Sequence, residues 1–151
     1  MNRDERVVDA VSDLTATVGV SAVAAIGIDA VDISEFERDM EIGGRGFLTQ
    51  AFSAAEIEHC DGDVEKLAAR FALKEAALKV LGTGIRGIGL HDVEVHTAPS
   101  GQPELRLSPG ARDIAASQTL GPLRCSATHE AGLALAVVVA PDRAVTSLED
   151  K

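Results

Sequence analysis

The sequence RFALKEAALKVLGTGIRG, residues 70–87, contains most of the long helix around which we expect the protein to fold. Extended backwards through VEKLAA, its apolar spacing predicts a helix over residues 64–81 that ends at Gly82. Placed at about 100° per residue, the apolar side chains form two stripes, so we expect the helix to be covered on two sides. The first stripe consists of Leu67, Phe71, Leu78 and Leu81, and the second of Leu73 and Val80.

A third face of this helix combines small and charged side chains: Ala68, Ala72, Glu75 and Lys79. Two explanations stay open for it. A Glu–Lys pair at i, i+4 is typical of a solvated helix surface, which it stabilises by only about 0.2–0.5 kcal/mol. Alternatively, the two alanines allow a ligand to approach one acid and one base closely.

The glycines after the helix, in GTGIRG at residues 82–87, match the dinucleotide-binding pattern G-x-G-x-x-G. That fingerprint needs a strand before the glycines and a helix after them, so that the diphosphate meets a helix N-terminus. Here the helix comes first and strands are predicted afterwards, so we reject this interpretation. A left-handed glycine that ends the helix accounts for Gly82, but not for Thr83 and Gly84 together.

Before the long helix, the chain predicts a strand and two short helices. The apolar segment AVAAIGID predicts a buried strand that ends at Asp29. Ser34 with Glu37 forms a capping-box pair that predicts a helix over residues 34–42, which GGRG ends. A second pair, Ser53-x-x-Glu56, predicts another helix start.

After the long helix, the chain predicts mainly strands. DVEVHT and PELRLS alternate apolar with polar residues around the turn SGQP, which is typical of a β-hairpin. PGARDIAASQTLG predicts a short helix, and LRCSATHEAGLALAVVVA predicts two strands joined by a turn. The sum is an α+β fold with a small antiparallel sheet packed around one long helix. We expect a helical N-terminal extension over residues 1–23, a domain over 24–140 and a tail over 141–151.

The composition limits the class of function. The chain has 151 residues, which suits one domain, and a net charge of -10 with a pI near 4.7. This balance argues against nucleic acid or an anionic membrane as a partner, because both require a basic surface. The apolar run at residues 18–28 is too short to span a bilayer. Two cysteines without C-x-x-C spacing favour reduced thiols in a cytoplasmic protein, and four scattered histidines do not support a zinc site.

Five segments together resemble a known family. They occur in the order GIDAVDI (27–33), FLTQAFSAAEI (47–57), RFALKEAALKVLGTGI (70–85), GQPELRL (101–107) and SATHEAGLALAVVV (126–139). The chain is thereby similar, over about residues 24–140, to holo-[acyl-carrier-protein] synthases, the small trimeric class of 4′-phosphopantetheinyl transferase. The most specific part is G-x-D near the start, followed by F-x-x-K-E-A-x-x-K in the long helix.

The resemblance implies an activity and a homotrimer. Such enzymes move the 4′-phosphopantetheine arm of coenzyme A to a serine of an apo acyl carrier protein and release adenosine 3′,5′-bisphosphate. A diphosphate substrate needs charge neutralisation, which Mg²⁺ bound by one or two carboxylates supplies. By the resemblance, Asp29 and Glu75 are the metal ligands, and Glu75 and Lys79 are catalytic. The implied coenzyme A contacts are Arg70, Lys74, Lys79, Gly82, Thr83, Gly84 and His129.

One segment departs from the family. Residues 29–41, DAVDISEFERDME, contain six acids and a single base, Arg38, and Glu35 stands where the family has an arginine that docks the acidic carrier. Such a surface would repel an acidic carrier helix. Three explanations stay open: an unusual carrier, docking through Arg45 and other surfaces, or a changed role. The last corresponds to a non-catalytic coenzyme A-binding or assembly module of the same fold.

Overall fold

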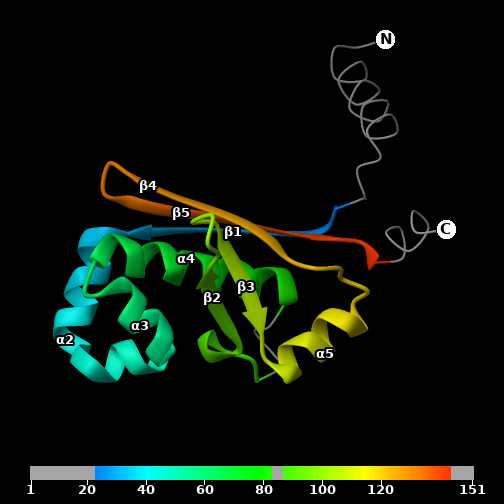
Figure 1. Ribbon diagram of the computed structural model, residues 1–151, viewed down its shortest axis with the longest axis horizontal. Coiled ribbons are helices and arrows are strands. Elements are labelled where there is room, and N and C mark those ends of the chain that lie inside the picture. The colour runs from blue at the N-terminus through cyan, green and yellow to red at the C-terminus, as the bar shows by residue number, and fades with distance from the viewer. Residues whose placement is uncertain (1–22, 83–86, 144–151) are drawn as a thin grey trace, which may run out of the picture.

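The computed structural model describes residues 23–82 and 87–143, and its elements surround one long helix (Figure 1). In chain order they are β1 (Val23–Asp32), α2 (Ile33–Ala51), α3 (Ala54–Cys60), α4 (Val64–Leu81), the 3₁₀ helix η1 (Leu90–Asp92), β2 (Val93–Thr97), β3 (Pro103–Leu107), α5 (Pro109–Ser117), β4 (Arg124–Glu130) and β5 (Leu133–Pro141). β1, β5 and β4 form one antiparallel sheet with β5 in the centre, and β2 pairs with β3 in a separate hairpin. The predicted α+β class is confirmed.

Helix α4 lies along one face of the three-stranded sheet, with α2 and α3 near one end and α5 near the other (Figure 1). Its predicted bounds, 64–81, are confirmed. The carboxylate of Asp63 caps the first turn by accepting from the Lys66 amide at 3.1 Å. Gly82 ends the helix with φ 66°, a left-handed conformation that glycine adopts without steric cost.

Two buried clusters explain why α4 is covered on two sides. One joins α4 to β1, β2, β5 and α5 through small and branched residues such as Ala76 and Val138. The other joins α4 to α2 and α3, and all four phenylalanines of the chain meet there. Their ring centroids lie 5.4–6.4 Å apart in Phe36–Phe47, Phe36–Phe52, Phe36–Phe71, Phe47–Phe71 and Phe52–Phe71.

The alanine face of α4 packs against protein and not against a ligand, which corrects one expectation. Ala68 and Ala72 are both 0% exposed. Opposite this helix, a Cβ at Gly27 would collide with the carbonyl oxygen of Ala76. Small residues on both elements therefore let β1 approach the α4 backbone closely.

Strand β1 also differs from the prediction of a buried strand that ends at Asp29. It continues to Asp32, and Asp29 lies inside it, opposite Ala136 of β5. Ile26 and Ile28 are 59% and 60% exposed. An apolar sequence indicates burial of both faces, but in this chain α4 covers only one face of the sheet.

Helix α2 begins one residue earlier than predicted, and the break predicted at GGRG is confirmed. Asp32, and not Ser34, is the N-cap: its Oδ1 accepts from the amides of Ser34 and Glu35 at 2.9 and 3.0 Å. Gly44, within GGRG, has the non-helical dihedrals φ 53° and ψ -140°, so α2 consists of two helical segments, and the second ends at Ala51. The second predicted start is confirmed, because Ser53 and Glu56 form a complete capping box.

The structure describes the start of the predicted C-terminal tail, but not the predicted N-terminal helix. Asp142 bridges to Leu120, and the Arg143 amide donates to the Thr119 carbonyl oxygen at 2.8 Å, so this part of the predicted tail is bonded to the domain. The predicted helical N-terminal extension and the rest of the tail lie outside the described residues. Among the described residues, no helix has the length and apolar character needed to cross a bilayer.

Candidate active site

Asp29, Glu75 and Lys79 come together where β1 crosses α4. Lys79 Nζ donates to Asp29 Oδ1 at 2.9 Å and to the Ile28 carbonyl oxygen at 2.8 Å. The Lys79 side chain is 52% exposed and that of Asp29 is 17% exposed, so this ion pair lies at the rim of the protein. Lys79 thus neutralises the charge of Asp29. The second acid of the site takes no part in this ion pair.

Glu75 is the second acid, one helical turn before Lys79. Burial raises the pKa of the Glu75 carboxyl most, the negative charge of Asp29 raises it further, and Lys79 partly offsets both effects. Asp29 and Glu75 line the same hollow, with a volume of about 320 Å³. The other residues that line it are Ala30, Val31, Asp32, Glu35, Phe36, Asp39, Phe47 and Phe71.

Two carboxylates at one hollow are a donor set that fits a Mg²⁺ ion. The electrostatic repulsion that raises the Glu75 pKa is the kind that a cation between the two carboxylates relieves. Within the described residues, no group of three or more His, Cys, Asp or Glu side chains is arranged to hold a metal. Two protein carboxylates are nevertheless sufficient for Mg²⁺. This ion binds one or two carboxylates of a protein and completes its coordination shell with water and phosphate oxygens.

Lys74 is placed in the core, which corrects its assignment as a coenzyme A contact. Its amine forms an ion pair of 2.7 Å with Glu56, and both side chains are 1% exposed. It also donates to the carbonyl oxygens of Ala51 at 2.8 Å and Leu90 at 3.3 Å. These acceptors occupy the three donors of an ammonium group, so none is left for a phosphate.

Arg70 is 8% exposed and lies one turn before Lys74. Its Nη2 donates to Thr97 Oγ1 at 2.8 Å, and this hydroxyl lies 3.3 Å from His59 Nε2. Arg70 Nε is buried and has no hydrogen-bond partner among the described residues. A buried donor without an acceptor is unfavourable, so this position suits an acceptor that a ligand supplies.

The remaining predicted contacts are only partly described. Gly82 is exposed at the C-terminus of α4, whereas Thr83 and Gly84 lie outside the described residues. His129, near the end of β4, has Nδ1 at 3.4 Å from a carboxylate oxygen of Glu65. Both side chains are about half exposed, so this contact contributes little to stability.

Four acids have surroundings that their sequence patterns did not predict. Asp32, Glu35 and Asp39 join the two predicted ligands at the hollow. The sequence placed these acids in the acidic segment 29–41, but did not indicate that their side chains border the site. Glu56 was recognised only as a capping residue, yet its Oε1 also accepts from the Val95 amide at 2.9 Å, and no local signal indicated that contact.

Comparison with known proteins gives one consistent result. The sequence model of the 4′-phosphopantetheinyl transferase superfamily matches residues 25–138. The chain is 39% identical over 117 residues to a holo-[acyl-carrier-protein] synthase of Geobacter sp. (strain M21), covering 75% of this chain and 94% of that protein. It is 40% identical over 117 residues to the synthase of Geobacter metallireducens, covering 75% and 93%.

Solved structures agree with this result. The crystal structure of the Helicobacter pylori synthase in complex with coenzyme A superposes with a TM-score of 0.69 at 34% identity, covering 76% of this chain and 98% of that one. The Neisseria meningitidis synthase gives a TM-score of 0.72 at 29% identity, covering 79% and 98%. With its fold, its site geometry and a family match over most of its length, the chain belongs to the 4′-phosphopantetheinyl transferase superfamily.

Proposed function

We propose that this protein is a holo-[acyl-carrier-protein] synthase that transfers the 4′-phosphopantetheine arm of coenzyme A to a serine of an apo acyl carrier protein. The observation that carries the proposal is the convergence of Asp29 and Glu75 at one hollow, with Lys79 bonded to Asp29 across about 50 residues of sequence. Relatives that are 39% and 40% identical to this chain over 117 residues carry this name. The enzyme is favoured over a non-catalytic module because a binding module does not need two acids next to a phosphate-binding lysine.

In this proposal, Asp29 and Glu75 are the residues that would hold a Mg²⁺ ion. When bound, the ion neutralises the charge of the diphosphate and of the leaving group. Lys79 keeps the Asp29 carboxylate in position through its 2.9 Å contact and offers the remaining donor of its ammonium group to a phosphate oxygen. Arg70 offers its unpaired Nε to another acceptor of the same substrate.

The reaction breaks the bond between the phosphopantetheine phosphorus and the diphosphate bridging oxygen. The serine oxygen forms the new bond to that phosphorus, and adenosine 3′,5′-bisphosphate leaves. The serine hydroxyl must lose a proton, and we assign its acceptance to Glu75. Glu75 is assigned this role because its carboxylate lines the hollow in which the substrate is proposed to bind.

We further propose that the protein is a homotrimer. Val23, Ile26 and Ile28 of β1 and Leu133 and Leu135 of β5 are 41–60% exposed. β1 and β5 are paired neighbours, so these side chains extend over one continuous apolar surface, which a single chain leaves in water. We place the trimer in the cytoplasm, where the free thiols of Cys60 and Cys125 stay reduced.

The transfer is tested with mass spectrometry of an apo carrier after incubation with the protein, coenzyme A and Mg²⁺. A gain of one phosphopantetheine on the carrier supports the enzyme. Glu35 and Asp39 border the site, so carriers with acidic and with less acidic surfaces should be compared, and we expect the less acidic ones to react faster at low salt.

Variants at the site complete this test. Glu75→Gln should abolish transfer and leave the circular dichroism spectrum unchanged, and substantial residual transfer would rule out the ligand role. Lys66→Gln, on an exposed part of the same helix, is the matched control and should retain activity. Binding of coenzyme A without transfer to any carrier would favour the non-catalytic module.

A further inference from the structure

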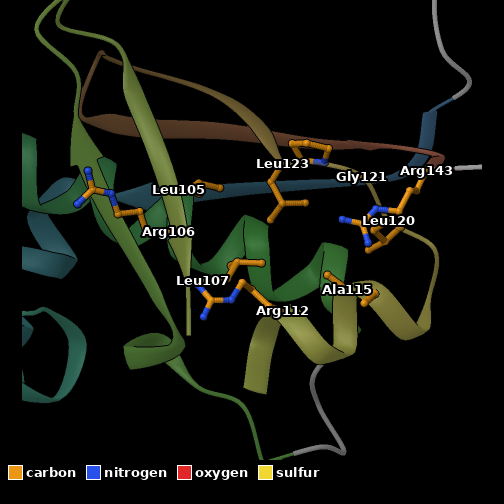
Figure 2. Close-up of a pocket in the computed structure, with 11 residues that line it drawn as sticks. Leu105, Arg106, Leu107, Arg112, Ala115, Leu120, Gly121, Leu123 and Arg143 are labelled. Atoms are coloured by element: carbon orange, nitrogen blue, oxygen red, sulfur yellow. The ribbon is translucent and has the colours of Figure 1, made fainter. Parts of the chain in front are cut away.

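A second hollow lies between β3, α5 and the start of β4, away from the proposed active site (Figure 2). We call it the α5 hollow. It shares no lining residue with the hollow of Asp29 and Glu75. Its volume of about 430 Å³ falls within the range of about 300–1,000 Å³ that is typical of small-molecule sites.

The walls of the α5 hollow are apolar. Leu105 and Leu107 project from one face of β3, as their alternation along the strand requires, and Leu123 faces them from the segment before β4 (Figure 2). All three are only half-buried. Ala115 and Leu120 close the side formed by α5 and its following turn, and both are less than 10% exposed. An aliphatic group in this space would cover leucine surface that now faces water.

The charged residues of the α5 hollow are all cationic. Arg112 lies beside Leu107, and Arg143 extends over the hollow from the other side, beside Leu120 (Figure 2). A third arginine, Arg106, extends from the opposite face of β3, so its guanidinium points away from Arg112 and Arg143 (Figure 2). Within the described residues, neither Arg112 nor Arg143 forms an ion pair.

The charge of the α5 hollow runs against that of the whole chain. The protein has 24 acidic and 14 basic residues, yet no acid lines this space. Asp113 and Asp142, the sequence neighbours of Arg112 and Arg143, are not among the lining residues. A hollow with only cationic groups at its rim concentrates anions in an otherwise anionic protein.

We propose that the α5 hollow binds a small amphipathic anion, an aliphatic body of several carbons that carries a carboxylate or a phosphate. The leucines contact the body, and the unpaired guanidinium groups of Arg112 and Arg143 hold the head, since guanidinium matches both carboxylate and phosphate. This site goes beyond the proposed transfer and does not depend on it.

The test uses methyl NMR of the full chain without coenzyme A, Mg²⁺ or carrier, so its result is independent of the proposed enzyme activity. Octanoate and octyl phosphate, kept below their micelle concentrations, are the two anionic probes. Acetate lacks the aliphatic body, and octylammonium carries the opposite charge. We expect saturable shifts of the Leu105, Leu107 and Leu123 methyl signals with at least one octyl anion, and the tighter probe identifies the head. The shifts should be absent with acetate and octylammonium.

Two arginine variants refine the result. Arg112→Gln and Arg143→Gln should each weaken binding by about three- to tenfold, because each removes one charged contact near the surface. Arg124→Gln changes an exposed arginine of β4 that does not line the hollow, so its affinity should stay within about twofold. The proposal is overturned if neither octyl anion shifts these signals, if octylammonium binds equally well, or if Arg124→Gln weakens binding as much as the other two. The comparison of the probes uses the unaltered protein, so it tests the proposal even if a variant fails to fold.

Discussion

Replacing Lys74 with methionine distinguishes a structural lysine from a ligand-binding one. Lys74 and Glu56 form a 2.7 Å ion pair in which both side chains are 1% exposed, and the lysine also lies 5.3 Å from the centroid of the Phe52 ring. Methionine keeps most of the volume and removes the charge. The Glu56 carboxylate then keeps its hydrogen bonds from the amides of Ser53 and Val95, but loses its counter-charge in the core.

Removing one member of a buried pair costs about 3–5 kcal/mol, because a charge stays behind without compensation. For a chain of this size, each kcal/mol lowers Tm by about 2–4 °C, so Lys74→Met should lower Tm by about 6–20 °C. The double variant Glu56→Gln/Lys74→Met leaves no buried charge and should lose less stability than Lys74→Met alone. Lys66→Met removes an exposed pair with Asp63 at 3.5 Å and should cost less than about 1 kcal/mol.

The assay is calorimetric unfolding at one fixed protein concentration, since self-association makes Tm depend on concentration. Isothermal titration with coenzyme A is carried out in parallel. The structural role predicts a large loss in Tm for Lys74→Met. If Tm changes by less than about 3 °C while coenzyme A affinity falls at least tenfold, the reasoning from burial is refuted and Lys74 contacts the ligand.

Three further predictions concern the sheet and the site. Gly27→Ala should destabilise the fold by about 1–3 kcal/mol or more, because its Cβ meets the carbonyl oxygen of Ala76, whereas Gly46→Ala, which faces open space, should not; equal Tm values for the two variants would contradict the close packing. In metal-free protein, the raised pKa of Glu75 means that the folded chain binds this proton more tightly than the unfolded chain. The free energy of unfolding should therefore fall as pH rises from about 4.3 towards the raised value, and denaturant titrations of Glu75→Gln should lack this decline; parallel pH curves would argue against it. Ile28→Asp should turn the proposed trimer into a monomer in light scattering, and an unchanged mass would exclude this face as the interface.

The cysteines show how a local pattern and the tertiary structure divide the information. The absence of C-x-x-C spacing predicted free thiols, and Cys60 and Cys125 are free. Burial raises the pKa of both thiols. Cys60, the last residue of α3, is almost completely enclosed in the cluster that joins α2, α3 and α4. The spacing of the cysteines was a local signal, whereas the environment of each thiol depends on segments that are distant in sequence.

The sequence by itself determined the local elements of this protein. Residues 64–81 form a helix because apolar periodicity and a terminal glycine act within a few residues. The hairpin of β2 and β3, the capping box at Ser53 and the start of α5 follow from equally local signals. The two acids and the lysine of the candidate site were also identified from the sequence, through the family resemblance of their segments.

What each face of a helix or strand contacts depends on the tertiary structure. Tertiary packing buries Ala68 and Ala72 of α4, leaves Ile28 in water, and places Lys74 against Glu56 inside the core. The physical reason is that burial depends on which distant segments pair, and one helix covers one face of a sheet and leaves the other for a partner. The contact between Lys79 and Asp29 joins residues 50 positions apart, a distance over which helical periodicity carries no information.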